Sequence, residues 1–354
     1  MPDRRRLVVF SRPVGLFSLY LQVLGQAWLC RQSDIIPIVY FNSGCLYWSD
    51  SDRYGARNVW EYYFEPLSPY RITDVAEADE ARLEHCTIWE FSRRETDPFI
   101  RPPESTMTIG SIPVSAGTVV SAAFPSNVVD WVWEMPRKRK LQLHCEIADS
   151  IRLRQTVSQK IDRFCETEMA GSRVLGVHIR GAERAPERAL FAPDGMLPID
   201  HYLREVDAYM GEHPKSLIFC ATDTQWPLDL LRERYGPSVL SYPAQRLGRA
   251  EEVVGLHHLP PGQVDRARLG EEVLIEGYLL SKCDFLIHGP SNVSLAATLL
   301  SPSLDHVDIY AKYGYDNAKH RYAYWKYRHA IRLLLGPLGM RRVQHAIGQL
   351  RRRR

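Results

Sequence analysis

The chain has 354 residues, of which 45% are hydrophobic and 25% are charged. At about 100 to 200 residues per domain this length predicts two domains, and the composition excludes a mainly disordered chain. The 45 Lys and Arg against 42 Asp and Glu give a net charge of +3, but residues 311–354 hold twelve of the basic residues and one acid, Asp316. The sequence therefore indicates a mildly acidic body followed by a strongly basic C-terminal tail.

No stretch approaches the roughly 18 apolar residues of a transmembrane helix, and the short apolar run near the start is cut by Ser11, Arg12 and Pro13. We therefore expect a cytoplasmic protein. The seven cysteines are scattered and contain no C-x-x-C pair, which favours free thiols over disulfides or a structural zinc site.

The first half begins with a predicted strand over 7–10, a turn, and an apolar helix from residue 16. A buried strand is predicted over 35–41. The following stretch, 42–69, is too aromatic for a disordered linker, so we expect an ordered loop region there. This half is predicted to be a loose Rossmann-like unit.

The second half shows a regular alternation of strands and helices. A helix is predicted over 147–166, and Gly171 is expected to end it. Further strands are predicted over 173–180, 216–220, 239–241 and 284–287, with helices over 199–210, 227–235, 269–282 and from 291. Such alternation predicts an α/β fold with a parallel sheet, whose ligands gather at the carboxyl ends of the strands.

Three of these strands are followed at once by polar residues. The first ends in His178 and Arg180, and an arginine there can clamp a phosphate with two parallel hydrogen bonds. An ion pair of Arg180 with Glu183 or Glu187 is an equally good interpretation of the local sequence. The second strand is followed by Asp223, which can accept hydrogen bonds from a ribose or a base, or can cap the next helix.

The third strand leads through Gly289 and Pro290 to Ser291, which is predicted to cap a helix beginning at Asn292. Free backbone N–H groups at such a helix start bind phosphate, and the Ser291 hydroxyl can add to them. Together the three segments describe a nucleotide pocket better than they describe three unrelated helix caps.

The motifs in these segments resemble the fucosyltransferase superfamily that contains nodulation α1,6-fucosyltransferases, core α1,6-fucosyltransferases and protein O-fucosyltransferases. The resemblance covers roughly residues 147–315 and rests on three motifs in order. The family's G-V-H-V-R-R-x-D-K corresponds to Gly176-Val177-His178-Ile179-Arg180-Gly181-Ala182-Glu183-Arg184. Its A-T-D-D corresponds to Ala221-Thr222-Asp223-Thr224, and its acid, L-S-x-x-D-F-L and serine turn correspond to Glu276, Leu280-Ser281-Lys282-Cys283-Asp284-Phe285-Leu286 and Ser291.

The chain departs from the family pattern at five positions. Charge is retained at Glu183, Arg184 and Glu276, but it is lost at Gly181 and Thr224. Because the family has a second Arg and a second Asp at those two positions, another nucleotide sugar stays open as the donor.

The resemblance implies an α/β enzyme of GT-B type with two Rossmann-like domains, an acceptor-side domain over 1–146 and a nucleotide-sugar domain over 147–315, with the basic tail over 316–354. Its activity would be the transfer of L-fucose from GDP-fucose to a glycan or glycoconjugate, with inversion and with no metal or other cofactor. The residues implied for donor binding are His178, Arg180, Asp223, Glu276, Ser291 and Asn292. For catalysis the resemblance implies Arg180, which would neutralise the leaving diphosphate, and Glu183 or Glu187 as general base.

The family's amino-terminal domain holds the acceptor, so the turn 14–17 and the run 58–63 are expected to face a cleft between the domains. The alternative is that Trp60 and Tyr62 are core residues at alternating strand positions. His178 and His288 can each be satisfied structural groups or catalysts; the structural interpretation is favoured for His178 and both stay open for His288.

The tail alternates apolar clusters with basic residues and ends in four arginines. Two short basic amphipathic helices there would suit an anionic membrane surface, so a peripheral position at the inner membrane face is expected. Non-specific nucleic-acid binding and a solvated tail without a partner are the alternatives; no specific nucleic-acid partner is expected. A catalytically silent sugar- or nucleotide-binding protein, or a scaffold that acts through its tail, are the rival functions.

Overall fold

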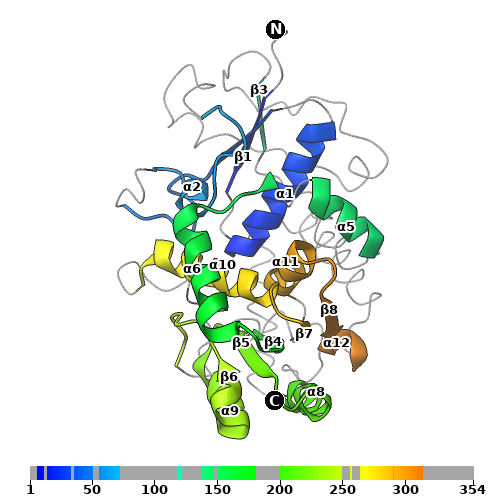
Figure 1. Ribbon diagram of the computed structural model, residues 1–354. Coiled ribbons are helices and arrows are strands. Elements are labelled where there is room, and N and C mark those ends of the chain that lie inside the picture. The colour runs from blue at the N-terminus through cyan, green and yellow to red at the C-terminus, as the bar shows by residue number, and fades with distance from the viewer. Residues whose placement is uncertain are drawn as a thin grey trace, which may run out of the picture.

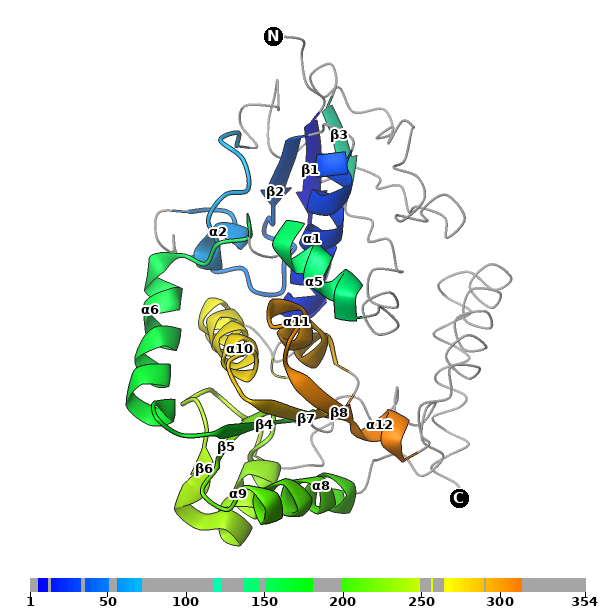
Figure 2. The same cartoon turned by 45° about the vertical axis from the view of Figure 1, so that its right-hand side comes forward.

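The protein is described by a computed structural model over residues 6–11, 14–32, 36–50, 56–71, 118–121, 137–146, 150–180, 199–248, 256, 264–289 and 291–313. Two separate parallel sheets lie at opposite ends of this part of the chain, and helices fill the space between them (Figures 1 and 2). The predicted α/β class with parallel strands is confirmed. Glu183, Glu187 and the tail 316–354 lie outside the described residues.

The first sheet has three parallel strands in the order β2-β1-β3. Its central strand is β1 (Arg6–Phe10), flanked by β2 (Ile36–Tyr40) and β3 (Thr118–Ser121). Helix α1 (Leu16–Gln32) connects β1 to β2 and lies between this sheet and the second one. The sequence predicted β1, α1 and β2 but not β3.

The second sheet has five parallel strands in the order β6-β5-β4-β7-β8. The strands are β4 (Val174–Ile179), β5 (Leu217–Thr222), β6 (Val239–Leu240), β7 (Phe285–His288) and β8 (Asp305–Asp308). All six residues of β4 are buried, as expected for a central strand covered on both faces.

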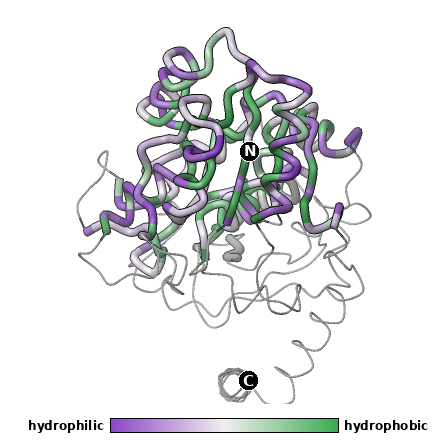
Figure 3. The backbone as a smooth tube through the Cα atoms, turned by 90° about the horizontal axis from the view of Figure 1, so that it is seen from below, coloured by the Kyte–Doolittle hydropathy of each residue, from purple (hydrophilic) through white to green (hydrophobic). Residues whose placement is uncertain are grey.

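Helices cover both faces of the second sheet. One face packs on α8 (Ile199–Glu212) and α9 (Gln225–Tyr235), and the other packs on α10 (Arg266–Leu280) and α11 (Asn292–Leu300). In the view from below, hydrophobic backbone positions gather toward the middle of the body (Figure 3). The four helices and the first four strands of this sheet agree with the sequence prediction.

The remaining helices are α2 (Trp60–Tyr63), α5 (Arg137–Glu146), α6 (Gln155–Phe164) with its π-helical extension Cys165–Met169, and α12 (Ile309–Lys312), besides a 3₁₀ turn at Gly236–Ser238. None of the helices in the described ranges combines the length and the apolar character needed to cross a bilayer. Gly171 follows the π-helix with a φ of 72°, so the predicted end of that helix is confirmed.

Two sequence expectations need correction. The stretch 42–69 contains the helical turn α2, and Trp60 and Tyr62 are 1% and 0% exposed. Both are core residues, so neither faces a cleft, but they belong to a helical turn rather than to a strand. Helix α6 begins at Gln155, because the backbone of 152–154 instead pairs with 63–65: the N–H of Glu65 donates to the carbonyl of Arg152 at 2.8 Å.

Helix α10 presents two glycines to the aromatic side chains of the first half. A Cβ at Gly277 would lie 2.2 Å from Cζ of Phe17, and one at Gly270 would lie 2.2 Å from the hydroxyl of Tyr63. Tyr63 also donates a hydrogen bond of 2.8 Å to the carbonyl of Ala267 on the same helix. The bare backbone of α10 therefore forms the contact surface between the two sheets. Phe17, in the turn that was expected to face a cleft, is instead buried in this contact.

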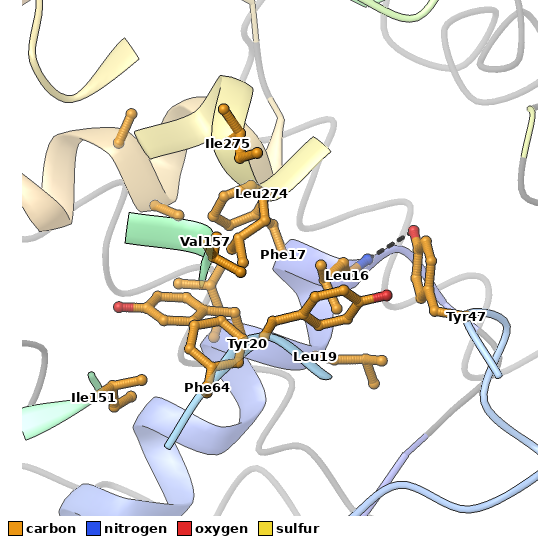
Figure 4. Packing of buried hydrophobic residues seen from close by; sticks show 14 of the residues in the cluster. Leu16, Phe17, Leu19, Tyr20, Tyr47, Phe64, Ile151, Val157, Leu274 and Ile275 are labelled. Atoms are coloured by element: carbon orange, nitrogen blue, oxygen red, sulfur yellow. Dashed lines mark hydrogen bonds between the residues drawn. The ribbon is translucent and has the colours of Figure 1, made fainter. Parts of the chain in front are cut away.

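An aromatic cluster continues this contact into the first half. Phe64 stacks on Trp60 with ring centroids 4.1 Å apart, and Tyr20 packs on Phe64 at 5.7 Å. Figure 4 shows Phe17 and Tyr20 of α1 beside Leu274 of α10, within one group of buried side chains. A single apolar cluster thus spans both sheets.

Replacement of Gly277 by Ala is expected to lower the free energy of unfolding by about 1 to 3 kcal/mol, because the new methyl group overlaps the buried ring of Phe17. Chemical denaturation measures this change. Gly211→Ala in α8 is the matched control, since nothing lies within 4 Å of a Cβ there; it should stabilise by about 0.5 to 1 kcal/mol. Equal stability of both variants would contradict close packing at Gly277.

Candidate functional site

The three polar segments singled out in the sequence meet at one edge of the second sheet. Strands β5, β4 and β7 are direct neighbours, and the register pairs Ile179 with Thr222 and His178 with His288. The residue that directly follows each strand is Asp223 after β5, Arg180 after β4 and Gly289 after β7. In a parallel α/β sheet this carboxyl edge is where ligands bind.

Arg180 is half-buried directly after the central strand β4. His178 is 6% exposed and belongs to the sheet face that carries α10 and α11, two residues along from Gly176. The acids Glu183 and Glu187 lie outside the described residues, so the structure decides neither their role nor their pairing with Arg180.

The loop after β5 is fixed by the segment 242–247, which we call the strap. Leu247 of the strap donates its N–H to the carbonyl of Asp223 at 2.9 Å and accepts from the N–H of Gln225 at 2.8 Å. The cap residue of α9 is Thr224, whose side chain makes no capping bond. The N-cap position of α9 thus falls on Thr224 rather than on Asp223.

The strap is held in turn by two acids of α10. Glu272 accepts the N–H of Gln245 at 2.9 Å, and Glu276 accepts the guanidinium of Arg246 at 2.7 Å. Glu276 and Arg246 form a buried ion pair, with side chains 8% and 6% exposed. Burial raises the pKa of Glu276 to about 8, and the Arg246 charge opposes that rise. The carboxylate predicted to bind the donor is thus engaged with Arg246.

Helix α11 begins at the same edge, as the sequence predicted. Ser291 is its cap, and the Ser291 hydroxyl accepts the N–H of Val293 at 3.2 Å. The N–H groups of Asn292 and Ser294 belong to the first turn, where a helix supplies no acceptor of its own. The helix start therefore offers backbone donors and partial positive charge to an anion.

The turn between β7 and α11 is anchored by a histidine pair that the sequence did not reveal. His288 is fully buried, and its Nδ1 lies 3.0 Å from the carbonyl of Gly289. Its Nε2 lies 3.0 Å from Nδ1 of His306 on β8. These contacts of His288 fit the structural one of its two sequence interpretations. His306 and Arg246 carry no motif that could have singled them out.

Taken together, the edge offers one guanidinium, one carboxylate and a helix start, on adjacent strands. This set suits a ligand with an anionic group and several hydroxyl or amide groups, as a nucleotide diphosphate has. Among the described residues, no three His, Cys, Asp or Glu side chains are grouped as a metal site would require.

Solved structures share this architecture. NodZ α-1,6-fucosyltransferase co-crystallised with GDP matches with a TM-score of 0.51 at 20% identity, over 85% of this chain and 93% of that one. The chain has the fold of a known fucosyltransferase. NodZ from Bradyrhizobium matches with the same TM-score and identity over 94% of its length, and POFUT1 in complex with GDP-fucose matches with a TM-score of 0.48 at 10% identity, over 85% of this chain and 94% of that one. No family model matches the sequence, and neither does any curated protein sequence.

The buried His288 makes stability depend on pH. Burial lowers its pKa from 6.5 to about 4, so the unfolded chain binds more protons between these values. The free energy of unfolding should therefore fall as the pH drops from about 6.5 to about 4, with a contribution from His288 of up to about 3 kcal/mol. Urea denaturation at several pH values measures the slope. His288→Asn, which keeps a donor near Nδ1 but does not titrate, should flatten it; an unchanged slope would contradict this assignment.

Proposed function

We propose that this protein is a GDP-fucose-dependent glycosyltransferase of GT-B type, acting on a glycan or glycoconjugate acceptor. The observation that carries the proposal is the convergence of Arg180, Asp223 and the start of α11 at one sheet edge, in the fold of an enzyme crystallised with GDP. The family resemblance of the motifs around these residues supports the same donor.

The reaction would be an in-line displacement at the anomeric carbon of the sugar, with inversion of configuration. The acceptor oxygen forms the new bond, and the bond to the diphosphate breaks with both electrons leaving on oxygen. Arg180 and the N–H groups of Asn292 and Ser294 would stabilise the charge that develops on the diphosphate. Asp223 would accept hydrogen bonds from the nucleoside, and Ser291 can donate its hydroxyl proton to a phosphate oxygen. His178 and Glu276 would also contribute to donor binding, Glu276 while it stays paired with Arg246.

A carboxylate would remove the proton of the acceptor hydroxyl, and Glu183 and Glu187 in the loop after Arg180 are the candidates. Arg180 and the start of α11 would balance the negative charge of the diphosphate, so the proposed mechanism uses no metal and no other cofactor. The acceptor would bind to the proposed first domain, 1–146, which contains the first sheet, and the donor would bind to the proposed second domain, 147–315.

Other readings of the same edge remain rivals. Gly181 and Thr224 replace charged family residues, which favours a different nucleotide sugar as the second candidate donor. A silent binding protein would bind nucleotide without turnover. A scaffold would act through its tail, and its activity would not change when Arg180 is replaced.

Calorimetry with GDP, UDP, ADP and GDP-fucose in the presence of EDTA tests the proposal. Selective GDP binding is expected, and Arg180→Ala should weaken it about 10- to 100-fold, because a charge-assisted hydrogen bond is lost. Arg173→Ala is the matched control: it removes an arginine beside the other end of β4, where its Nε donates to Tyr209. Absence of nucleotide binding, or equal loss in both variants, would overturn the proposal.

We also propose that the basic tail holds the enzyme at an anionic membrane surface on the cytoplasmic side. Its cations should contribute about 1 kcal/mol each near such a surface. Removal of residues 323–354 should abolish sedimentation with vesicles of anionic lipid at low salt while GDP affinity is unchanged. The deletion leaves in place the contacts of Lys312 and Tyr313 with Glu205 on α8. Unchanged vesicle binding, or binding only to nucleic acid, would contradict this role.

A further inference from the structure

The carbonyl of Gly289 is held by two side chains. His288 Nδ1 lies 3.0 Å from it and must donate, because a carbonyl oxygen can only accept. The Ser294 hydroxyl lies 3.1 Å from the same oxygen, with the carbonyl of Ser291 at 3.0 Å. Gly289 is thus tied both to the strand before it and, through Ser294, to the helix after it.

His306 supports the protonation state of His288 that the Gly289 carbonyl requires. Since a neutral imidazole has one donor and one acceptor, donation from Nδ1 leaves Nε2 of His288 as an acceptor. Nδ1 of His306, 3.0 Å away, must then donate to it. Were His306 absent, His288 could still donate to Gly289, but the competing tautomer and other ring orientations would no longer be disfavoured.

The surroundings of Gly289 leave little space on the side where a side chain would lie. A Cβ at Gly289 would lie 2.6 Å from the hydroxyl of Tyr202 on α8 and 3.0 Å from the ring of Tyr310 on α12. The charged groups near the histidine pair are Lys140 of α5, which is buried, and Asp305 and Asp308 of β8. Asp308 is itself engaged with the N–H groups of Tyr310 and Ala311.

We propose that His306, acting through His288, is a positioning residue for Gly289 and Ser291 and hence for the anion-binding start of α11. His306 is an exposed residue, so its place in this chain is explained by the hydrogen bond to His288 rather than by burial. The effect on the donor rests on the proposed function above; the effect on the turn does not.

Two variants of His306 distinguish a role of its Nδ1 hydrogen-bond donor from a role of side-chain bulk alone. In His306→Asn the amide nitrogen takes the place of Nδ1 and keeps the donor, whereas His306→Leu removes it. Amide hydrogen exchange at Val293 and Leu295, whose N–H groups are bonded to Ser291, reports the start of α11 directly and needs no ligand. We expect exchange about tenfold faster in His306→Leu and close to wild type in His306→Asn, as the loss of one net hydrogen bond implies.

GDP affinity measured on the same proteins reports the consequence for the donor. We expect about three- to tenfold weaker GDP binding in His306→Leu, restored in His306→Asn, with melting temperatures recorded for all three proteins. Faster exchange in His306→Leu without GDP binding by any protein would support the positioning role and reject the proposed function. Unchanged exchange in His306→Leu, or equal change in both variants, would overturn the positioning role whether or not GDP binds.

Discussion

The contact between aromatic side chains of the first half and the bare backbone of α10 is the constraint on which the rest of the structure depends. Phe17 lies over Gly277 and Tyr63 lies over Gly270, and the two glycines are about two helical turns apart on α10. Without Cβ atoms at these points the rings reach the helix backbone itself. This closeness merges the cores of the two sheets into one apolar cluster.

The same helix governs the candidate site from its other side. Glu272 and Glu276 hold the strap 242–247, and the strap holds the loop that carries Asp223. Burial of Glu276 is costly in itself, and the ion pair with Arg246 offsets that cost while fixing one geometry. The geometry of the candidate site therefore depends, through α10, on the packing of α10 against the first half.

Elements with a strong local pattern could be predicted from the sequence. The apolar runs of β4, β5 and β7 and the cap at Ser291 are encoded by neighbouring residues, so both the strands and their polar ends were found. Strand β8 is short and polar, and helix α5 begins with four basic residues, so neither has an apolar pattern of its own. Their positions come from tertiary contacts, such as the bond from Arg137 to the carbonyl of Ser303.

The same reasoning explains which parts of the site were missed. Arg246 meets Glu276, and His306 meets His288, across sequence separations that no spacing rule describes. The acids Glu183 and Glu187 stay predictions, since they lie outside the described residues. Thr224 is the N-cap residue of α9, and the carbonyl of Asp223 accepts the N–H of Leu247 in the strap.

The order in which the chain is made gives the Phe17 contact a further consequence. Helix α1 emerges from the ribosome with Phe17 still uncovered, because its partner helix α10 begins only at Arg266. At about 5 to 20 residues per second, its apolar surface waits roughly 10 to 50 seconds for that partner. The Phe17 face of α1 is therefore exposed during synthesis long before the helix that covers it exists.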